Sequence, residues 1–212
     1  MSTLPPSLRE RNRRAAEIEI SESALELFEK QGIQSTSVEQ IASGAGVSER
    51  TVFRYFAHKE DTALVAHTEL RRTLRESIDE STFAQDPLQC ILEAYEHVFV
   101  EFDDSESPLT TALLRVDRLK NDEPLLLEAG LRVDSDQTSW LIELLTERGA
   151  CDRLDASVIA ETVGQLFRLT LQRWADTHRQ GADPATMLET FHEVREANFR
   201  LNDALRDRLG SD

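Results

Sequence analysis

The chain has 212 residues, of which 40% are hydrophobic and 30% are charged, and its formal net charge is -16. This composition is typical of a folded, water-soluble protein and excludes an intrinsically disordered one. No apolar run approaches the ~20 residues that a membrane-spanning helix needs, and the N-terminal residues lack the apolar segment of a secretory signal. We therefore expect a cytoplasmic protein with no membrane partner. Cys90 and Cys151 form no CxxC motif, which argues against a disulfide framework or a zinc site.

The acidic charge is unevenly distributed along the chain. Residues 1–60 carry eight Lys and Arg against nine Asp and Glu, which gives a net charge of -1. Residues 61–212 carry sixteen against thirty-one, which gives -15. Net acidity disfavours a nucleic-acid partner, but binding depends on the local field that a patch presents. A nucleic-acid partner is therefore compatible with the N-terminal part of the chain.

Apolar residues recur at spacings of three and four along nearly the whole chain, which predicts an all-α protein of about nine helices. The first helix is expected to end at Gly32, a residue suited to the left-handed position past a helix end. Ser37 and Gln40 form a capping-box pair that opens a very short second helix. Ser48 is expected to cap a third short helix that ends near Tyr55.

Six longer helices are expected after these three, and turn residues mark most of their ends. The expected bounds are about 59 to 81, Asp86–Pro87 to a polar break at 103–107, then to about 120, Pro124 to Gly149, Asp155 to near Gly181, and Asp183–Pro184 to Gly210.

This pattern predicts two domains. Residues 1–60 form a small three-helix domain that is preceded by a flexible basic arm over about residues 1–14, and residues 61–212 form a larger helical domain. The arm contains the arginines at positions 9, 11, 13 and 14. These arginines could reach DNA or could equally belong to a solvated tail.

Two short helices joined by a tight glycine turn predict a helix-turn-helix. Ala42 is expected to be small because the following helix crosses close to it, and Gly46 supplies a turn conformation that a side chain would hinder. Val52 is expected to pack back between the helices. Phe53 and Phe56 are expected to belong to the small core.

The second helix of this pair has an exposed face and N-terminal end, which is what a recognition helix presents to the major groove. Arginine reads guanine and threonine can donate to bases or phosphates, while Tyr55, His58 and Lys59 are placed to bond phosphates. The N-terminus of the helix opened by Ser37 is a second expected phosphate site. The alternative is a solvated helix face. The candidate DNA-binding residues are Ser37, Ser48, Glu49, Arg50, Thr51, Arg54, Tyr55, His58 and Lys59.

The last two expected helices each carry a stripe of mostly apolar residues. Two stripes per chain suit a four-helix dimer interface, and the polar Asn198 would fix its register. The alternative is that both stripes face the core of a single chain. The candidate interface residues are Val163, Leu166, Thr170, Trp174, Met187, Phe191, Val194, Asn198 and Leu201.

Large or amphipathic residues on the central helices could line a mostly apolar effector pocket, although each could also be an ordinary core residue. The candidate pocket residues are Tyr95, His97, Phe99, Trp140 and Phe167. The sequence contains no metal-ligand cluster, phosphate loop or nucleophile motif, so we expect no enzyme, no metal and no cofactor.

The run from Ala24 to Leu64, ALELFEKQGIQSTSVEQIASGAGVSERTVFRYFAHKEDTAL, resembles the DNA-binding domain of TetR-family transcriptional regulators. This resemblance implies a homodimeric repressor that binds a palindromic DNA operator and is released when a small molecule enters the C-terminal helical domain. The chain departs from the family pattern at Glu49, which could accept a hydrogen bond from cytosine or weaken the contact there. In such proteins the residues that touch DNA match Ser48, Arg50, Thr51, Arg54, Tyr55 and Lys59.

The C-terminal part resembles the family in its layout of five helices. The segment that begins at Trp140 and the later run FRLTLQRWAD are similar to regulators that sense long-chain acyl-coenzyme A thioesters, which implies an acyl-CoA-like effector. A second function remains open. The near-neutral charge of residues 1–60 also fits a helical scaffold protein whose DNA-binding domain no longer has a specific target.

Overall fold

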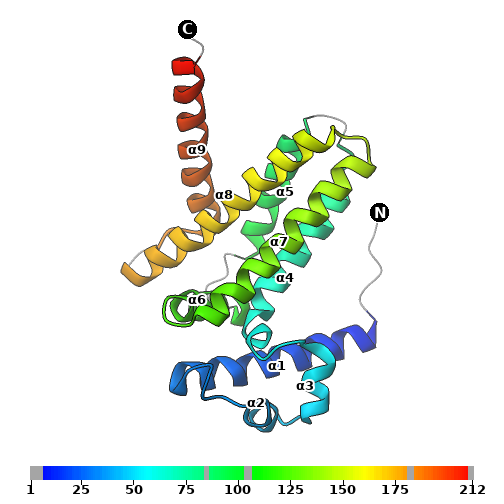
Figure 1. Cartoon of the computed structure of the whole chain (residues 1–212), viewed down its shortest axis with the longest axis vertical. Helices are drawn as coiled ribbons and strands as arrows, with labels where there is room; N and C mark the ends of the chain where they lie inside the picture. The colour runs from blue at the N-terminus through cyan, green and yellow to red at the C-terminus, as the bar shows by residue number, and fades with distance from the viewer. Residues whose placement is uncertain (1–6, 84–85, 103–106, 181–183, 210–212) are drawn as a thin grey trace. The chain divides into compact units, whose positions relative to one another are not determined.

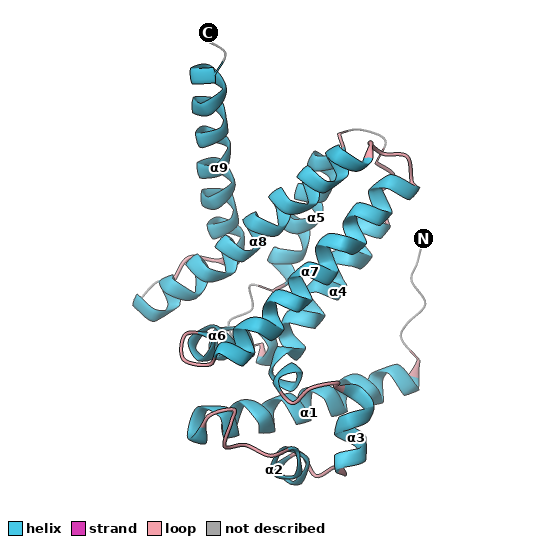
Figure 2. Ribbon diagram, viewed as in Figure 1, coloured by secondary structure: helices cyan, strands magenta, loops and turns pink. Residues whose placement is uncertain are grey.

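Helices make up nearly all of the chain that the structure describes (Figure 2). The computed structural model describes residues 7–83, 86–102, 107–180 and 184–209. These ranges contain nine α-helices, one short 3-10 helix and no strand. The predicted all-α fold is therefore confirmed. None of these helices is both long enough and apolar enough to cross a membrane.

Three helices at the N-terminal end of the chain pack around a small apolar core (Figure 1). They are α1 (Leu8–Gln31), α2 (Val38–Gly44) and α3 (Glu49–Tyr55). α1 ends at Gly32 as predicted, and the φ of 79° at this residue lies in the left-handed region that favours glycine. The predicted capping box is also present, because Ser37 and Gln40 each accept the backbone amide of the other at 3.1 Å and 2.9 Å.

The basic N-terminal segment is helical from Leu8 onward, which corrects the prediction of a flexible arm over this part. Ser7 and Glu10 form a second capping box, in which the Glu10 carboxylate accepts the Ser7 amide at 2.7 Å. This backbone hydrogen bond holds the pKa of Glu10 below its usual range. The spacing Ser-x-x-Glu could have predicted this helix start from the sequence. Residues 1–6 lie outside the described residues.

The turn between α2 and α3 has the predicted conformation. Gly46 has a φ of 65°, and the Val47 amide donates to the Ala42 carbonyl at 2.9 Å. The Ser48 side chain accepts the Thr51 amide at 3.2 Å and caps α3. These contacts set the direction in which α3 leaves the turn.

α1 and α2 approach each other closely at Gly44. A Cβ on Gly44 would lie 2.2 Å from the Oγ of Ser23, which is far inside van der Waals contact. Ser23 is buried, and its hydroxyl donates to the Ile41 carbonyl at 3.0 Å. The sequence interpretation assigned the need for a small residue to Ala42, which is buried, and missed Gly44.

The chain continues through a 3-10 helix, η1, and six further α-helices. The predicted start at Asp86 is confirmed, because its carboxylate accepts the Leu88 amide at 2.9 Å. The predicted fourth helix begins instead as η1 and becomes α-helical at Val65. The observed bounds are η1 Glu60–Leu64, α4 Val65–Asp79, α5 Pro87–Glu101, α6 Pro108–Lys120, α7 Pro124–Glu147, α8 Arg153–Gln180 and α9 Met187–Leu209.

Two predicted helix starts are wrong. α8 begins at Arg153 because Asp152, rather than Asp155, supplies the cap and accepts the Asp155 amide at 2.9 Å. α9 begins after Thr186, whose hydroxyl accepts the Glu189 amide at 3.1 Å in a further capping box. Residue 183, most of the predicted break at 103–107, and the predicted helix ends at 181 and 210 lie outside the described residues.

The chain divides into two compact units. Unit 1 comprises residues 1–69 and 111–132, and unit 2 comprises residues 70–110 and 133–212. The division falls inside α4, α6 and α7 and does not follow the boundary expected at residue 60. The boundary between a DNA-binding and an effector-binding part near residue 60 therefore stays a prediction.

Within unit 1, the end of α6 and the loop that follows it are held against α1. The Glu123 carboxylate accepts the backbone amide of Ile33 at 2.9 Å. Arg115 donates to Glu29 at 2.8 Å and to Glu22 at 2.6 Å, and the pair with Glu29 is the main cause that raises the pKa of Arg115. Residues far along the chain thus support the three N-terminal helices.

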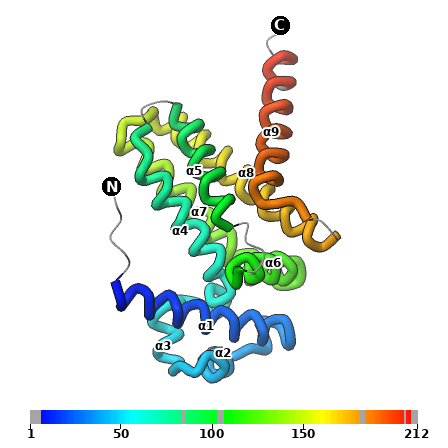
Figure 3. The backbone as a smooth tube through the Cα atoms, turned by 180° about the vertical axis from the view of Figure 1, so that it is seen from behind, coloured from blue at the N-terminus to red at the C-terminus, as the bar shows by residue number. Residues whose placement is uncertain are grey.

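Unit 2 is built around four aromatic side chains. Tyr95 and Phe99 from α5, Phe167 from α8 and Phe191 from α9 are each no more than 1% exposed. Their ring centroids lie 5.2 to 6.1 Å apart, which is the range of favourable aromatic pairs. α5, α8 and the first half of α9 meet at this aromatic cluster (Figure 3).

A methyl group added at Gly44 should destabilise the packing of α1 on α2. Gly44→Ala forces the Ser23 hydroxyl away from the Ile41 carbonyl, and we expect the free energy of unfolding to fall by about 1–3 kcal/mol. Chemical denaturation followed by circular dichroism measures this change. Ser43→Ala, at an exposed position of the same helix, is the control and should change it by less than about 0.5 kcal/mol.

The same clash predicts coupling between the two residues. A Ser23→Ala, Gly44→Ala double variant should lose less stability than the two single variants added together. Strict additivity would show that the approach of Gly44 to Ser23 does not limit the packing.

Candidate functional site

The outer face of α3 carries two arginines and an aromatic ring. Glu49, Arg50, Phe53 and Arg54 are exposed, whereas Val52 is 1% exposed and packs into the three-helix core. Among the described residues, neither Glu49 nor Arg50 has a side-chain hydrogen-bond or ion-pair partner. The helix is fixed from behind, and this face is free to meet another molecule.

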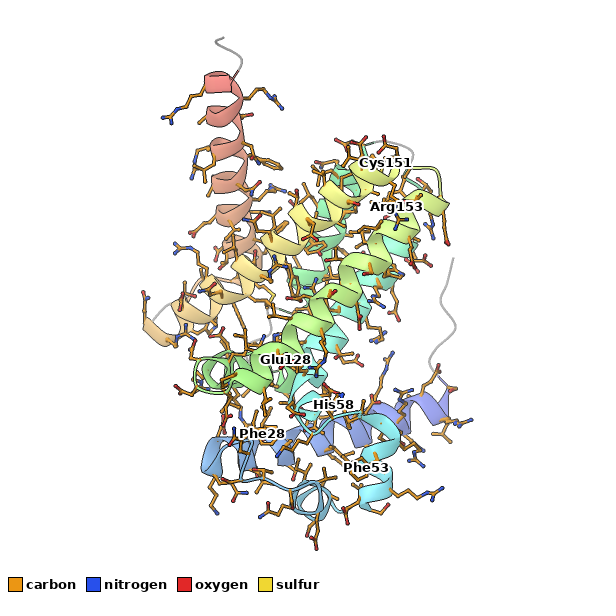
Figure 4. The ribbon with its side chains drawn as sticks, viewed as in Figure 1. Phe28, Phe53, His58, Glu128, Cys151 and Arg153 are labelled. Atoms are coloured by element: carbon orange, nitrogen blue, oxygen red, sulfur yellow. The ribbon has the colours of Figure 1, made fainter. Side chains whose placement is uncertain are left out.

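Phe53 does not lie in the core, which corrects the sequence interpretation. Its side chain is 61% exposed, at the position labelled in Figure 4. Successive helical residues turn by about 100°, so Phe53 points well away from Val52. Phe56 directly follows the last residue of α3 and is half-buried. The exposed ring of Phe53 is a candidate functional group that sequence reasoning missed, and its angle from Val52 was the available signal.

Arg54 and Tyr55 form a preorganised pair at the end of α3. Arg54 Nη2 donates to the Tyr55 hydroxyl at 2.7 Å, and its Cζ lies 4.6 Å from the centroid of the Tyr55 ring. The Cζ of Arg13 in α1 lies 5.7 Å from the same centroid, and its Nε binds Glu17 at 2.7 Å. One arginine of the predicted arm is therefore held beside α3, although its side chain is 59% exposed, and Arg9 and Arg11 are exposed as well.

Two hydroxyl groups among the candidate DNA-binding residues cap helices, and a third is hydrogen-bonded to one of them. The Ser48 and Thr51 hydroxyls lie 2.9 Å apart, and each of Ser37 and Ser48 accepts a backbone amide of its own helix. The side chain of His58 is exposed, while its backbone amide donates to Asp61 at 3.0 Å. DNA contacts by these residues stay predictions.

Lys59 has a structural role that the sequence interpretation did not include. Its Nζ donates to the carbonyl oxygens of Ile33 at 2.6 Å and Thr36 at 2.9 Å, and so ties the chain after α3 to the loop between α1 and α2. A lysine ammonium has three N–H groups. The predicted phosphate contact is therefore limited to the one N–H that remains.

The five predicted pocket residues do not form one group. Tyr95, Phe99 and Phe167 belong to the aromatic cluster, and Trp140 is half-buried on α7. The side chain of His97 is 74% exposed on the outer side of α5, so its assignment to a buried pocket is corrected. In the described ranges, no three or more His, Cys, Asp or Glu side chains are grouped so that they could hold a metal ion.

Most of the predicted dimer-interface residues are buried inside a single chain. A side chain that is at most 9% exposed in one chain has almost no surface left for a second chain. The alternative therefore holds for these residues, and Asn198, which is half-buried, and Leu201, which is 68% exposed, are the two that remain accessible. The buried residues are Val163, Leu166, Thr170, Trp174, Met187, Phe191 and Val194.

Comparison with known proteins identifies relatives of this chain. The family model described as "Bacterial regulatory proteins, tetR family" matches residues 20–64. The HTH-type transcriptional regulator TcmR of Streptomyces glaucescens is 32% identical over 149 residues, which cover 69% of this chain and 66% of TcmR. The putative mycofactocin biosynthesis transcriptional regulator MftR of Mycobacterium tuberculosis is 36% identical over 91 residues, which cover 42% of this chain and 44% of MftR. The chain thus spans just under two thirds of the first relative and less than half of the second.

Solved structures share the fold. A putative TetR-family transcriptional regulator from Syntrophomonas wolfei has a TM-score of 0.59 at 18% identity, covering 91% of this chain and 95% of that one. NalD, the secondary repressor of the MexAB-OprM multidrug efflux pump in Pseudomonas aeruginosa, has a TM-score of 0.55 at 20% identity, covering 89% and 96%. At these identities the likeness shows the fold alone. The matched family and curated relatives are transcriptional regulators and not enzymes.

Replacement of Lys59 should destabilise unit 1 as well as affect any ligand of α3. Lys59→Met removes two hydrogen bonds from a charged donor, and we expect the free energy of unfolding to fall by about 1.5–3 kcal/mol. Thermal and urea denaturation measure the loss. Lys30→Met, at an exposed position of α1, is the matched control and should change stability by less than about 0.5 kcal/mol. Equal stability of both variants would show that the Lys59 contacts contribute nothing to folding.

Proposed function

Because the chain belongs to the TetR family of bacterial regulatory proteins, we propose that it binds a palindromic DNA operator as a homodimer and represses transcription there. We also propose that a small molecule bound in unit 2 releases the operator. The observation that carries the proposal is the free outer face of α3, where Arg50, Phe53 and Arg54 are exposed on a helix that its own caps and core hold in place.

The chemistry of this face suits the major groove. A guanidinium can donate two parallel hydrogen bonds to O6 and N7 of guanine, and an exposed phenylalanine ring suits contact with the methyl group of thymine. Arg54 is the stronger candidate for a base reader, because its bond to Tyr55 limits the directions it can take. Glu49 can accept a hydrogen bond from the amino group of cytosine and repels phosphate, so it would favour particular sequences over general affinity.

The charge distribution supports selective rather than general DNA binding. Residues 61–212 carry a net charge of -15, which opposes the approach of a polyanion that the α3 face does not hold specifically. In a homodimer, two α3 helices about 34–36 Å apart would meet successive turns of the major groove. A palindromic site with that half-site spacing is therefore the expected operator.

The dimer proposal rests on the second half of α9. From Phe199 to Arg208, every side chain that the structure describes is exposed, and this part of the helix extends beyond α5 and α8 (Figures 1 and 3). Within the described ranges, this end of α9 has no other helix against it to stabilise it and depends on the packed first half of the helix. Phe199, which is 38% exposed, and Leu201 provide apolar surface for the same segment of a second chain.

Base reading by α3 should appear in DNA-binding measurements on an operator selected from random sequences. Arg54→Ala should cost about 1–3 kcal/mol of operator affinity and relax the preference at one base pair. For Phe53→Ala, we expect that replacing one thymine by uracil no longer weakens binding, although the same replacement weakens binding of the unsubstituted protein. Fluorescence anisotropy at several salt concentrations measures both effects.

The control is Arg118→Ala, an equal loss of charge at an exposed position of α6, which should leave operator affinity unchanged. An equal loss from Arg54→Ala on operator and random DNA would reject its base-reading role. If no sequence is selected and binding is weak on all DNA, the repressor proposal fails and the scaffold alternative remains.

A charge placed on the exposed end of α9 should dissociate the dimer. Leu201→Asp should weaken self-association at least tenfold, which sedimentation velocity or light scattering over a range of concentrations can measure. Leu131→Asp makes the same change at a leucine of α7 that is 54% exposed and should leave the dimer intact. A protein that is monomeric without substitution, or a Leu201→Asp dimer of unchanged affinity, would contradict this interface.

A further inference from the structure

The interior of unit 2 contains a row of paired polar groups between α4 and α7. Arg71 donates to Asp134, and Arg75 Nε donates to Gln137 Oε1 at 2.6 Å. Both pairings advance in the same direction along the two helices, which run side by side (Figures 1 and 3). Arg71 and Arg75 are four residues apart, so the two pairs lie about one helical turn from each other. We call these four residues the polar row.

Two nitrogen atoms of the polar row are buried without a hydrogen-bond partner among the described residues. They are Nη1 of Arg71, a residue that is 4% exposed, and Nε2 of Gln137, a residue that is 3% exposed. The assignment at Gln137 follows from chemistry, because Arg75 Nε can only donate and the amide oxygen must therefore face it. Buried donors in native proteins are nearly always paired, since an unpaired one loses its hydrogen bonds to water.

Aromatic rings lie against the polar row. The Cζ of Arg71 is 3.5 Å from the centroid of the Phe167 ring, and the Cζ of Arg75 is 5.1 Å from that of Trp140. Tyr95 is 1% exposed and lies beside Phe167. Burial raises the pKa of its hydroxyl, and both the charge of Arg71 and a hydrogen bond with the Arg71 side chain partly offset this rise. Arg75 and Trp140 are half-buried, so the row is accessible from their end, and its inner end at Arg71 is closed.

The free groups of the polar row are donors, and the charges of its own four residues do not cancel. Two arginines of the row face one aspartate of the row, and the exposed Asp136 adds a second carboxylate near Arg75. Desolvation is the main cause that lowers the pKa of Arg75, and the charge of Asp136 partly offsets it. A singly negative group that only accepts hydrogen bonds would satisfy both free donors at the buried end of the row.

We propose that the polar row anchors the effector of this regulator, and that the effector joins one anionic oxygen group to an apolar, preferably aromatic, body. A carboxylate or an ionised phenol supplies the acceptor. The anion binds at Arg71 and Gln137, and the apolar body lies toward Trp140 at the accessible end. This inference rests on the proposal that unit 2 holds the effector.

A second place in unit 2 provides the comparison. A shallow depression of about 350 Å³ on the outer face of α8 is lined by residues of that helix alone, among them Glu161, Gln165 and Arg168. Its acidic and basic groups offset each other, and it has no buried free donor. A ligand that bound there would show no preference for an anion.

The test measures binding of 1-naphthoate and decanoate to the full-length protein by titration calorimetry, with the neutral amide of each acid as its partner compound. At least one acid should bind about tenfold or more tightly than its amide. Gln137→Glu keeps an oxygen acceptor for Arg75 Nε and replaces the free donor by an acceptor, so it should remove at least about tenfold of that affinity without lowering the thermal midpoint of the ligand-free protein. If Gln137 only supports Arg75, the same variant should leave acid binding unchanged.

Two further variants complete the design. Gln165→Leu, in the α8 depression, should leave acid binding unchanged. Arg71→Met combined with Asp134→Leu removes the ion pair as a pair, which preserves folding better than removal of one partner, and should abolish the preference for acid over amide.

Certain outcomes would overturn the anchor. If neither acid binds better than its amide, or if Gln137→Glu leaves the preference intact, the free donors serve buried water only. Operator release is measured separately, by adding the acid to the protein–DNA complex. Acid binding that depends on Gln137 while the complex persists would keep the anchor and reject effector-driven release.

Discussion

A helix of seven residues is not stable alone in water, and this constraint governs the N-terminal part of the protein. α3 has that length, so its position depends on contacts made by other residues. The Ser48 cap fixes its start, the close approach at Gly44 fixes α2 against α1, and Lys59 ties the chain beyond it to the α1–α2 loop. None of these contacts uses the outer face of α3. The exposed side chains on that face are therefore not needed to hold the helix in position.

The features that could be predicted from the sequence are those that local chemistry decides. A capping pair or a turn glycine acts within a few residues, so Ser37, Gly46 and Ser48 indicated the helix-turn-helix correctly. The sequence left open which way the stripes on α8 and α9 face, because an apolar spacing of three and four is the same for a helix that faces its own core and one that faces a partner. Most of these residues are buried in their own chain, and Leu201 is exposed. The free donors at Arg71 and Gln137 could not be predicted, since they depend on which residues meet across two helices.

The proposed DNA face and the proposed effector anchor are linked by continuous helices. α4 and α7 each begin in unit 1 and end in unit 2, and both members of the polar row on each helix lie within a few residues of that division. In unit 1, Arg115 of α6 binds Glu29 of α1, and Glu123, which directly precedes α7, binds the backbone of Ile33 just after α1. A ligand that changes the pairing of α4 with α7 therefore acts on elements that also belong to the unit with the DNA face.

The exposed end of α9 has a consequence for dosage. If that segment is ordered only in the dimer, its folding and chain association are one equilibrium, and the amount of dimer rises with the square of the monomer concentration when the protein is scarce. A twofold fall in cellular copy number would then reduce the dimer about fourfold in that regime. Occupancy of the operator would respond to synthesis and dilution of the protein more steeply than for a regulator that binds as a preformed dimer.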